Sequence, residues 1–122
     1  MTGATRSPNE RARVKRGDIW TVSGAPGYGS KPRPALIVQS DALAETESLI
    51  TCGLTAQPDT ERYFRPAIEP SPGNGLDRLS HVMTEKLTAI PRAKLGGRIG
   101  ALTDEEMVRV ERALQLVLGF AE

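Results

Sequence analysis

Short stretches of β-favouring residues, separated by turns, dominate most of the chain. Residues 19–22 read Ile-Trp-Thr-Val, and residues 34–39 form a short apolar run that begins with a proline. Residues 49–56 and 79–90 are also rich in β-formers, and glycine- and proline-containing segments separate these runs. Branched and aromatic residues favour strands, and a strand tolerates proline at its first position. The pattern therefore predicts a mainly β protein.

Within residues 49–56, the two-residue period of a strand separates two faces. Ile50 and Cys52 share the more apolar face, which we expect to be the buried one. Thr55 lies on the more polar face near the strand end, where its hydroxyl can point into a cleft, although threonine is also common in strands for its β propensity alone. A further strand is expected within residues 59–72, at a sheet edge because this segment contains proline.

A helix is expected at the C-terminal end of the chain. Thr103 and Glu106 have the spacing of a capping box, and the acidic first turn suits the helix dipole. Apolar residues then recur on one stripe, which we expect to pack on the sheet as far as Phe120. The stripe consists of Met107, Val110, Leu114, Val117 and Leu118. Residues 91–100 are basic and contain glycines, so we expect a connection there.

The composition is that of one globular domain. The 122 residues are 39% hydrophobic and 25% charged, and a chain of this length buries roughly two-thirds of its unfolded surface. No apolar run approaches the roughly 20 residues of a membrane-spanning helix. Residues 1–13 are polar, lack the apolar centre of a signal peptide and are typical of a disordered leader, which leaves a single domain over residues 14–122. We therefore expect a cytoplasmic protein with no membrane partner.

Charge and cysteine content exclude several kinds of site. The net charge of +1 argues against a uniformly basic surface, so binding to nucleic acid would require a local group of cations. Cys52 is the one cysteine, which excludes an intramolecular disulfide, and we expect it to be a small core residue rather than a metal ligand. The glycines of residues 23–31 match no Walker or dinucleotide-binding loop, so we expect no nucleotide cofactor.

Arg33 stands between two prolines, directly before the apolar run of residues 34–39. Proline fixes its own backbone and pushes the preceding residue toward extended conformations, so we expect the guanidinium to be held on a stiff loop. Such an arginine is pre-organised to bind an anion. Taken alone, however, a Lys-Pro-Arg-Pro segment is more often an ordinary loop before a core strand.

Two aromatic residues and one histidine each allow two interpretations. Trp20 suits either sheet packing or stacking on a nucleobase. Tyr28 is flanked by glycines in a loop that we expect to be mobile, so an exposed ring could contact a ligand or partner. His81 shares a strand face with Glu85, which suits an acid–base pair, but a lone histidine in a strand is more often packed or on the surface.

Three motifs together resemble a known family. They are Arg16-Gly17-Asp18-Ile19-Trp20, then Arg33-Pro34-Ala35-Leu36-Ile37-Val38-Gln39-Ser40-Asp41, then Leu54-Thr55-Ala56-Gln57. In this order and at this spacing they are similar to the MazF/PemK family of bacterial toxins, over residues 14–120. The resemblance implies an α+β, mainly β fold: a strongly bent, SH3-like antiparallel barrel of the CcdB/PemK type with a C-terminal helix. It also implies a homodimer whose groove binds single-stranded RNA, and a cognate MazE-like antitoxin.

The resemblance assigns catalysis to Arg33 and Thr55. An arginine stays protonated at neutral pH, so Arg33 suits the stabilisation of charge on the phosphate better than the acceptance of a proton. Lys31 is the nearer candidate for proton transfer if it is buried. Leu79 departs from the acidic residue that many relatives carry, which puts an ion pair there in doubt. RNA recognition is assigned to Trp20, Tyr28, Ser30, Lys31, Gln57, Arg78, Glu85 and Lys86.

The expected function is a sequence-specific endoribonuclease that needs no metal and leaves a 2′,3′-cyclic phosphate and a 5′-hydroxyl. Two alternatives stay open. A noncatalytic CcdB-like toxin of the same fold poisons DNA gyrase by binding it, but those relatives lack the pairing of Arg33 with Thr55. An inactive RNA-binding or antitoxin-regulating relative would keep the fold without the cleavage.

Overall fold

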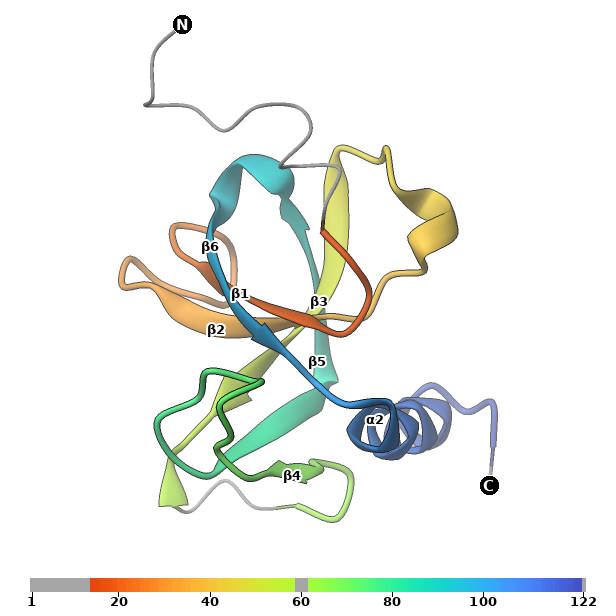
Figure 1. Ribbon diagram of the computed structural model, residues 1–122. Coiled ribbons are helices and arrows are strands. Elements are labelled where there is room, and N and C mark those ends of the chain that lie inside the picture. Colours follow the sequence, from red (N-terminus) through yellow and green to blue (C-terminus); the bar gives the residue numbers. More distant parts are fainter. Residues whose placement is uncertain (1–13, 59–61, 122) are drawn as a thin grey trace, which may run out of the picture.

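One strongly bent antiparallel sheet, with a helix packed against it, makes up most of the computed structural model, which describes residues 14–58 and 62–121 (Figure 1). The sheet has six strands in the order β4-β5-β3-β2-β1-β6. The strands are β1 (Asp18–Val22), β2 (Arg33–Ile37), β3 (Ser48–Thr55), β4 (Ala67–Ile68), β5 (Ser80–Pro91) and β6 (Leu95–Ala101). The helices are η1 (Asp41–Leu43), η3 (Arg92–Lys94) and the C-terminal α2 (Asp104–Val117).

The predicted mainly β fold with a C-terminal helix is confirmed, and β4 is an edge strand as expected. The expected leader, residues 1–13, lies outside the described residues. In the part of the chain that the structure describes, no helix is both long enough and apolar enough to cross a membrane.

Each face of the sheet covers its own apolar cluster, because neighbouring residues of a strand point to opposite faces. In β1, for example, Trp20 belongs to the first cluster and Ile19 to the second. The first core contains Val14, Trp20, Val22, Ala25, Tyr28, Ala35, Ile37, Leu49, Ile90 and Leu95. The second, which we call the helix-side core because α2 closes it, contains Ile19, Leu36, Cys52, Leu54, Ile68, Val82, Leu102, Met107 and Val110.

Strand β3 is therefore buried on both faces, and the prediction of one buried face is wrong at its start. Leu49 is buried in the first core, whereas Ile50, on the face expected to be buried, is 40% exposed. Cys52 lies on the same face as Ile50 and is fully buried in the helix-side core, as predicted. The difference arises because α2 covers only part of this face, and the period of a strand does not reveal where that cover ends.

Strand β6 occupies residues 95–101, whereas the sequence predicted a connection over residues 91–100, so that prediction is wrong for residues 95–100. Its glycines lower the apparent strand propensity, but close packing requires two of them. A Cβ atom on Gly96 would lie 2.2 Å from Thr21 Oγ1, and one on Gly100 would lie 2.4 Å from the backbone of Asn74. The glycines are needed because another segment approaches the strand at each of these points.

The Arg16-Gly17-Asp18 segment connects the sheet to the helix. Asp18 is buried, accepts a hydrogen bond from Trp20 Nε1 and forms a salt bridge with Arg98 of β6, with an N···O distance of 3.2 Å. Arg16 forms a salt bridge with Glu111 of α2 at 2.8 Å. These contacts hold the start of β1 between its neighbouring strand and the helix.

Helix α2 begins as the sequence predicted. The capping box between Thr103 and Glu106 is formed in both directions. Met107 and Val110 are buried in the helix-side core. The expected packing as far as Phe120 is wrong, because the helix ends at Val117 and Leu118 and Phe120 are exposed.

Candidate active site

A cavity of about 740 Å³ opens where the start of β2, the end of β3 and the segment before β5 meet. It is lined by Thr21, Gly27, Arg33, Pro34, Leu54, Thr55, Ala56, Gln57, Pro58, Gly75, Leu76, Asp77, Arg78, Ser80, Met83 and Ile99. Four residues predicted for the site, namely Arg33, Thr55, Gln57 and Arg78, are thus brought to one cavity although they come from three separate parts of the chain.

Arg33 and Arg78 are the two cationic residues among those that line this cavity. Arg33 is the first residue of β2, opposite Val22 of β1, and not part of the preceding loop as expected. Neither guanidinium has a hydrogen-bond or salt-bridge partner within residues 14–58 and 62–121. Several other arginines do have partners: Arg16, Arg65 and Arg98 form salt bridges, and Arg92 and Arg109 donate to backbone carbonyls. The two cavity arginines are therefore available for an anionic ligand.

Thr55 is the last residue of β3 and pairs with His81 of β5 in the ladder. Its Oγ1 accepts a hydrogen bond of 3.2 Å from the backbone N–H of Gln57. Because a hydroxyl can accept and donate at the same time, the proton of Thr55 is left to donate to a ligand. The same hydrogen bond turns the chain after the strand and places Gln57 at the cavity.

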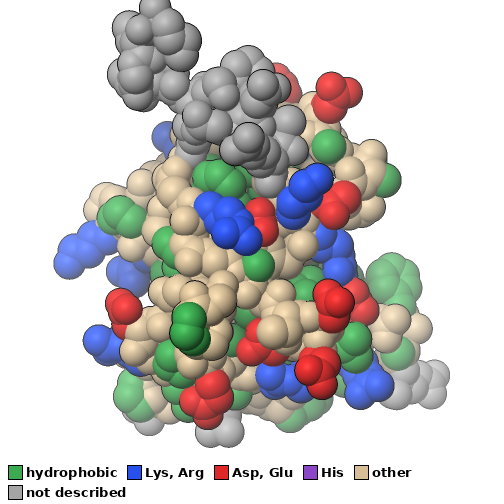
Figure 2. All heavy atoms as spheres, in the orientation of Figure 1, with side chains coloured by type: hydrophobic (Ala, Val, Ile, Leu, Met, Phe, Trp, Pro, Cys, Tyr) green, Lys and Arg blue, Asp and Glu red, His purple; other side chains and the backbone are tan. Residues whose placement is uncertain are grey.

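The surface charge agrees with a local rather than a general anion site. On the face shown in Figure 2, Lys and Arg side chains are interspersed with Asp and Glu side chains and do not gather into one broad basic patch. Because the net charge of the whole chain is only +1, affinity for a polyanion depends on particular positions, such as the pair of cavity arginines.

Tyr28 is not the exposed loop residue that the sequence predicted. It is 4% exposed and belongs to the first core. Its loop is a tight, hydrogen-bonded turn, in which the Gly24 N–H donates to the Gly29 carbonyl at 2.6 Å and the Tyr28 N–H to the Ala25 carbonyl at 3.0 Å. This turn folds the ring back onto the sheet. Trp20 is buried in the same core, so in this structure neither ring presents a face to a nucleobase.

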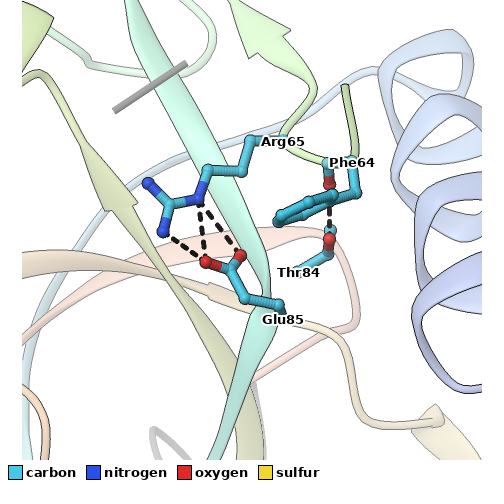
Figure 3. Close-up of polar contacts among 4 residues, drawn as sticks. All are labelled: Phe64, Arg65, Thr84 and Glu85. Atoms are coloured by element: carbon cyan, nitrogen blue, oxygen red, sulfur yellow. Dashed lines mark hydrogen bonds and ion pairs between the residues drawn. The ribbon is translucent and has the colours of Figure 1, made fainter. Parts of the chain in front are cut away.

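Glu85 is paired with Arg65 and does not line the cavity. Figure 3 shows the two side chains facing each other, with Arg65 Nε 3.1 and 3.0 Å from the two carboxylate oxygens. The hydrogen bond from Arg65 lowers the pKa of Glu85 below its ordinary value. Beside this pair, Thr84 donates to the Phe64 carbonyl. Glu85 thus helps to hold the segment before β4, and the acid–base pair with His81 is not supported.

Three of the residues predicted to bind RNA, Ser30, Lys31 and Lys86, are exposed and do not line the cavity. Lys31 was a candidate for proton transfer on the condition that it is buried, and its exposure means that this condition is not met. Asp77 is a cavity residue that the sequence interpretation missed, although its position next to Arg78 was a usable signal. Within the described ranges, no three His, Cys, Asp or Glu residues are grouped in a way that could hold a metal ion.

Comparisons with known proteins agree with this architecture. A family model for the PemK-like, MazF-like toxin of type II toxin–antitoxin systems matches residues 15–118. The probable endoribonuclease MazF of Mycolicibacterium smegmatis is 40% identical over 108 residues, which cover 88% of this chain and 99% of that protein. Endoribonuclease EndoA of Bacillus subtilis is 29% identical over 113 residues, covering 89% and 97%.

Solved structures share the fold. An endoribonuclease in complex with its cognate antitoxin, from a mycobacterial species, matches with a TM-score of 0.73 at 24% identity, over 89% of this chain and 98% of that one. A MazF–MazE structure from Deinococcus radiodurans matches with a TM-score of 0.69 at 16% identity, over 87% and 95%. The match of the family model over most of the chain and the 40% identical relative show that this chain belongs to the PemK-like, MazF-like family of toxins of type II toxin–antitoxin systems.

Proposed function

We propose that the cavity is the catalytic site of an endoribonuclease toxin, and that Arg33 and Thr55 act there on single-stranded RNA. The relatives from M. smegmatis and B. subtilis bear the name endoribonuclease and align over most of their length. The observation that carries the assignment is that Arg33 and Thr55 line one cavity, the arginine without a partner and the threonine with its proton free to donate. We expect this activity in the cytoplasm.

The chemistry follows from the groups at the cavity. The 2′-hydroxyl of a nucleotide gives its proton to solvent water and its oxygen forms a bond to the adjacent phosphorus. The bond from phosphorus to the 5′-oxygen of the next nucleotide breaks, and that oxygen takes a proton from solvent water. Negative charge builds on the phosphate oxygens as this happens, and the positively charged guanidinium of Arg33 stabilises it. Thr55 donates a hydrogen bond to the same phosphate and holds it in line. The products are a 2′,3′-cyclic phosphate and a 5′-hydroxyl.

Arg78 and Gln57 line the same cavity and suit substrate binding. The guanidinium of Arg78 fits a second phosphate of the strand, and the Gln57 amide, with a donor and an acceptor, fits a nucleobase edge. We propose cleavage without a metal ion, because the Arg33 guanidinium can supply the positive charge that a metal would otherwise bring to the phosphate.

The antitoxin-bound relatives suggest how such a toxin is controlled. We propose that this chain forms a homodimer and binds a cognate MazE-like antitoxin, through an acidic segment of the antitoxin that covers Arg33 and Arg78. Opposite charges across the interface would favour such a complex. A mixture of toxin and antitoxin should therefore leave RNA intact.

The test is cleavage of single-stranded RNA by the purified protein in excess EDTA, with the product ends identified chemically. We expect a 2′,3′-cyclic phosphate and a 5′-hydroxyl. Arg33→Ala and Thr55→Ala should each lower the rate by about 10²-fold or more, the typical cost of removing a group that stabilises transition-state charge. Arg112→Ala is the matched control, because Arg112 is exposed on α2 and lies outside the cavity. This variant should cleave RNA at the wild-type rate.

Products that end in a 3′-hydroxyl, or full activity of Arg33→Ala, would contradict this assignment. Growth arrest that persists in Arg33→Ala without RNA cleavage would instead favour the noncatalytic, gyrase-binding kind of toxin.

A further inference from the structure

Asp77 is the only carboxylate among the described residues that line the cavity, and Arg33 and Arg78 line it as well. If RNA binds here, as proposed above, a negative side chain faces a negatively charged backbone. Two like charges repel each other, which weakens binding unless the carboxylate meets another part of the substrate. Apart from the ribose hydroxyl groups, the hydrogen-bond donors of RNA are the N–H groups of its nucleobases.

The segment that carries Asp77 is held by Asn74, which is fully buried. The Asn74 Oδ1 atom accepts from the backbone N–H groups of Ser71 and Leu76, both at 3.0 Å, and its Nδ2 donates to the Glu69 carbonyl at 2.8 Å. These three hydrogen bonds all join the Asn74 amide to its own loop. Asn74 thus fixes the backbone directly before Asp77.

Contact with β6 fixes the same segment from outside. Gly75 has a φ of +70°, and a Cβ atom there would lie 2.2 Å from the carbonyl oxygen of Ile99. The Ala101 N–H donates to the Gly73 carbonyl at 3.0 Å. Because the loop is held by its interior and by the neighbouring strand, the backbone of Asp77 keeps a defined place at the cavity, as a recognition residue requires.

An ionised carboxylate only accepts hydrogen bonds. Adenine, cytosine and guanine each carry an exocyclic amino group that can donate to it. Uracil has no amino group, and its N3–H lies between two carbonyl oxygens, which repel a carboxylate. We propose that Asp77 is a specificity-determining residue, which accepts a hydrogen bond from the amino group of one nucleobase at the cavity and rejects uracil at that position. The inference rests on the proposed function and adds to it a residue that distinguishes one nucleobase from another.

The test is cleavage of a single-stranded RNA pool with a randomised segment, followed by sequencing of the 5′ ends of the products. For the wild-type protein we expect uracil to be depleted by about tenfold at one position near the cut, since one good base contact discriminates by about this factor or more. Asp77→Asn keeps the shape and adds donors that suit the uracil carbonyls, so uracil should rise at that position by about tenfold. Asp77→Ala should remove the bias without reversing it.

Glu69→Gln is the matched control, because it removes one exposed carboxylate of the same loop that does not line the cavity, and its cleavage profile should equal that of the wild type. If Asp77→Asn shows the same base preference near the cut as the wild type, the inference is overturned. It is also overturned if Asp77→Asn cleaves all sequences more slowly by the same factor, with the base preference retained. A wild-type protein that cleaves no RNA would instead overturn the proposed function itself, so the two failures are distinguishable.

Discussion

The hydroxyl of Tyr28 donates a hydrogen bond to Thr51 Oγ1, 2.8 Å away, in the interior of the bent sheet. The direction is settled by the next contact, because Thr51 gives its own proton to the Thr88 carbonyl at 3.0 Å. Burial raises the pKa of Tyr28, since the ionised phenolate would lose its solvation. The chain Tyr28–Thr51–Thr88 connects the loop after β1 with β3 and β5.

Replacing Tyr28 by Phe should therefore affect stability and not RNA binding. The substitution leaves Thr51 without its donor while the ring still fills the core, so we expect a loss of about 1 kcal/mol in the free energy of unfolding. Urea denaturation measures this loss. The rate of RNA cleavage by the folded variant should equal that of the wild type, and a large fall in RNA affinity with unchanged stability would contradict the buried role of Tyr28.

The pair formed by Arg65 and Glu85 should contribute to stability in a pH-dependent way. The Arg65 side chain is only 9% exposed and that of Glu85 28%, and the contact is bidentate, so the coupling free energy in a double-mutant cycle with Arg65→Met and Glu85→Gln should be about 1 kcal/mol. A coupling near zero would show that the pair is not formed in solution.

The sign of the pH effect follows from the lowered pKa of Glu85. The carboxylate is favoured in the folded state, so its contribution is complete above the ordinary glutamate pKa of about 4.3 and is lost as the pH falls through the lower folded value. The stability deficit of Glu85→Gln relative to the wild type should therefore shrink below about pH 4. Urea denaturation of both proteins at several pH values above and below this point measures the deficit. A deficit that grows as the pH is lowered would contradict the expectation.

Two glycines of β6 provide a matched test of close packing. A Cβ atom on Gly100 would lie 2.4 to 2.5 Å from the backbone of Gly73 and Asn74, whereas one on Gly97 would meet nothing within 4 Å. We expect Gly100→Ala to lower the free energy of unfolding by about 2 kcal/mol or more, because backbone atoms must move. Gly97→Ala should change it by no more than about 0.5 kcal/mol in either direction. Equal effects in thermal or urea denaturation would contradict the close contact.

Cys52 should report on unfolding. It is fully buried, and burial, with a smaller effect from the charge of Glu85, raises the pKa of its thiol to about 12. The thiolate is the form that reacts, so Ellman's reagent should label the native protein at least about a hundredfold more slowly than the protein in concentrated guanidinium chloride. Labelling of both at similar rates would show that the helix-side core opens readily around Cys52.

Much of the candidate site could be predicted from residues alone. Arg33 and Thr55 stand in motifs whose order and spacing resemble those of a known family, and both line the cavity. Asp77 was missed because its place depends on how Asn74 and β6 hold the loop before it. Glu85 was assigned to RNA because no local pattern shows that Arg65, 20 residues earlier, would bind it.

By itself, the sequence determined the elements whose signals are local: the period of a strand for β1, β2, β3 and β5, and the capping box for α2. Only the tertiary structure decided what each face of those elements meets. The turn that folds Tyr28 inward, the strand built from the glycines of β6 and the partial cover of β3 by α2 all depend on the curvature of the sheet. That curvature arises from contacts between distant segments, and these contacts cannot be predicted from the periodicity of neighbouring residues.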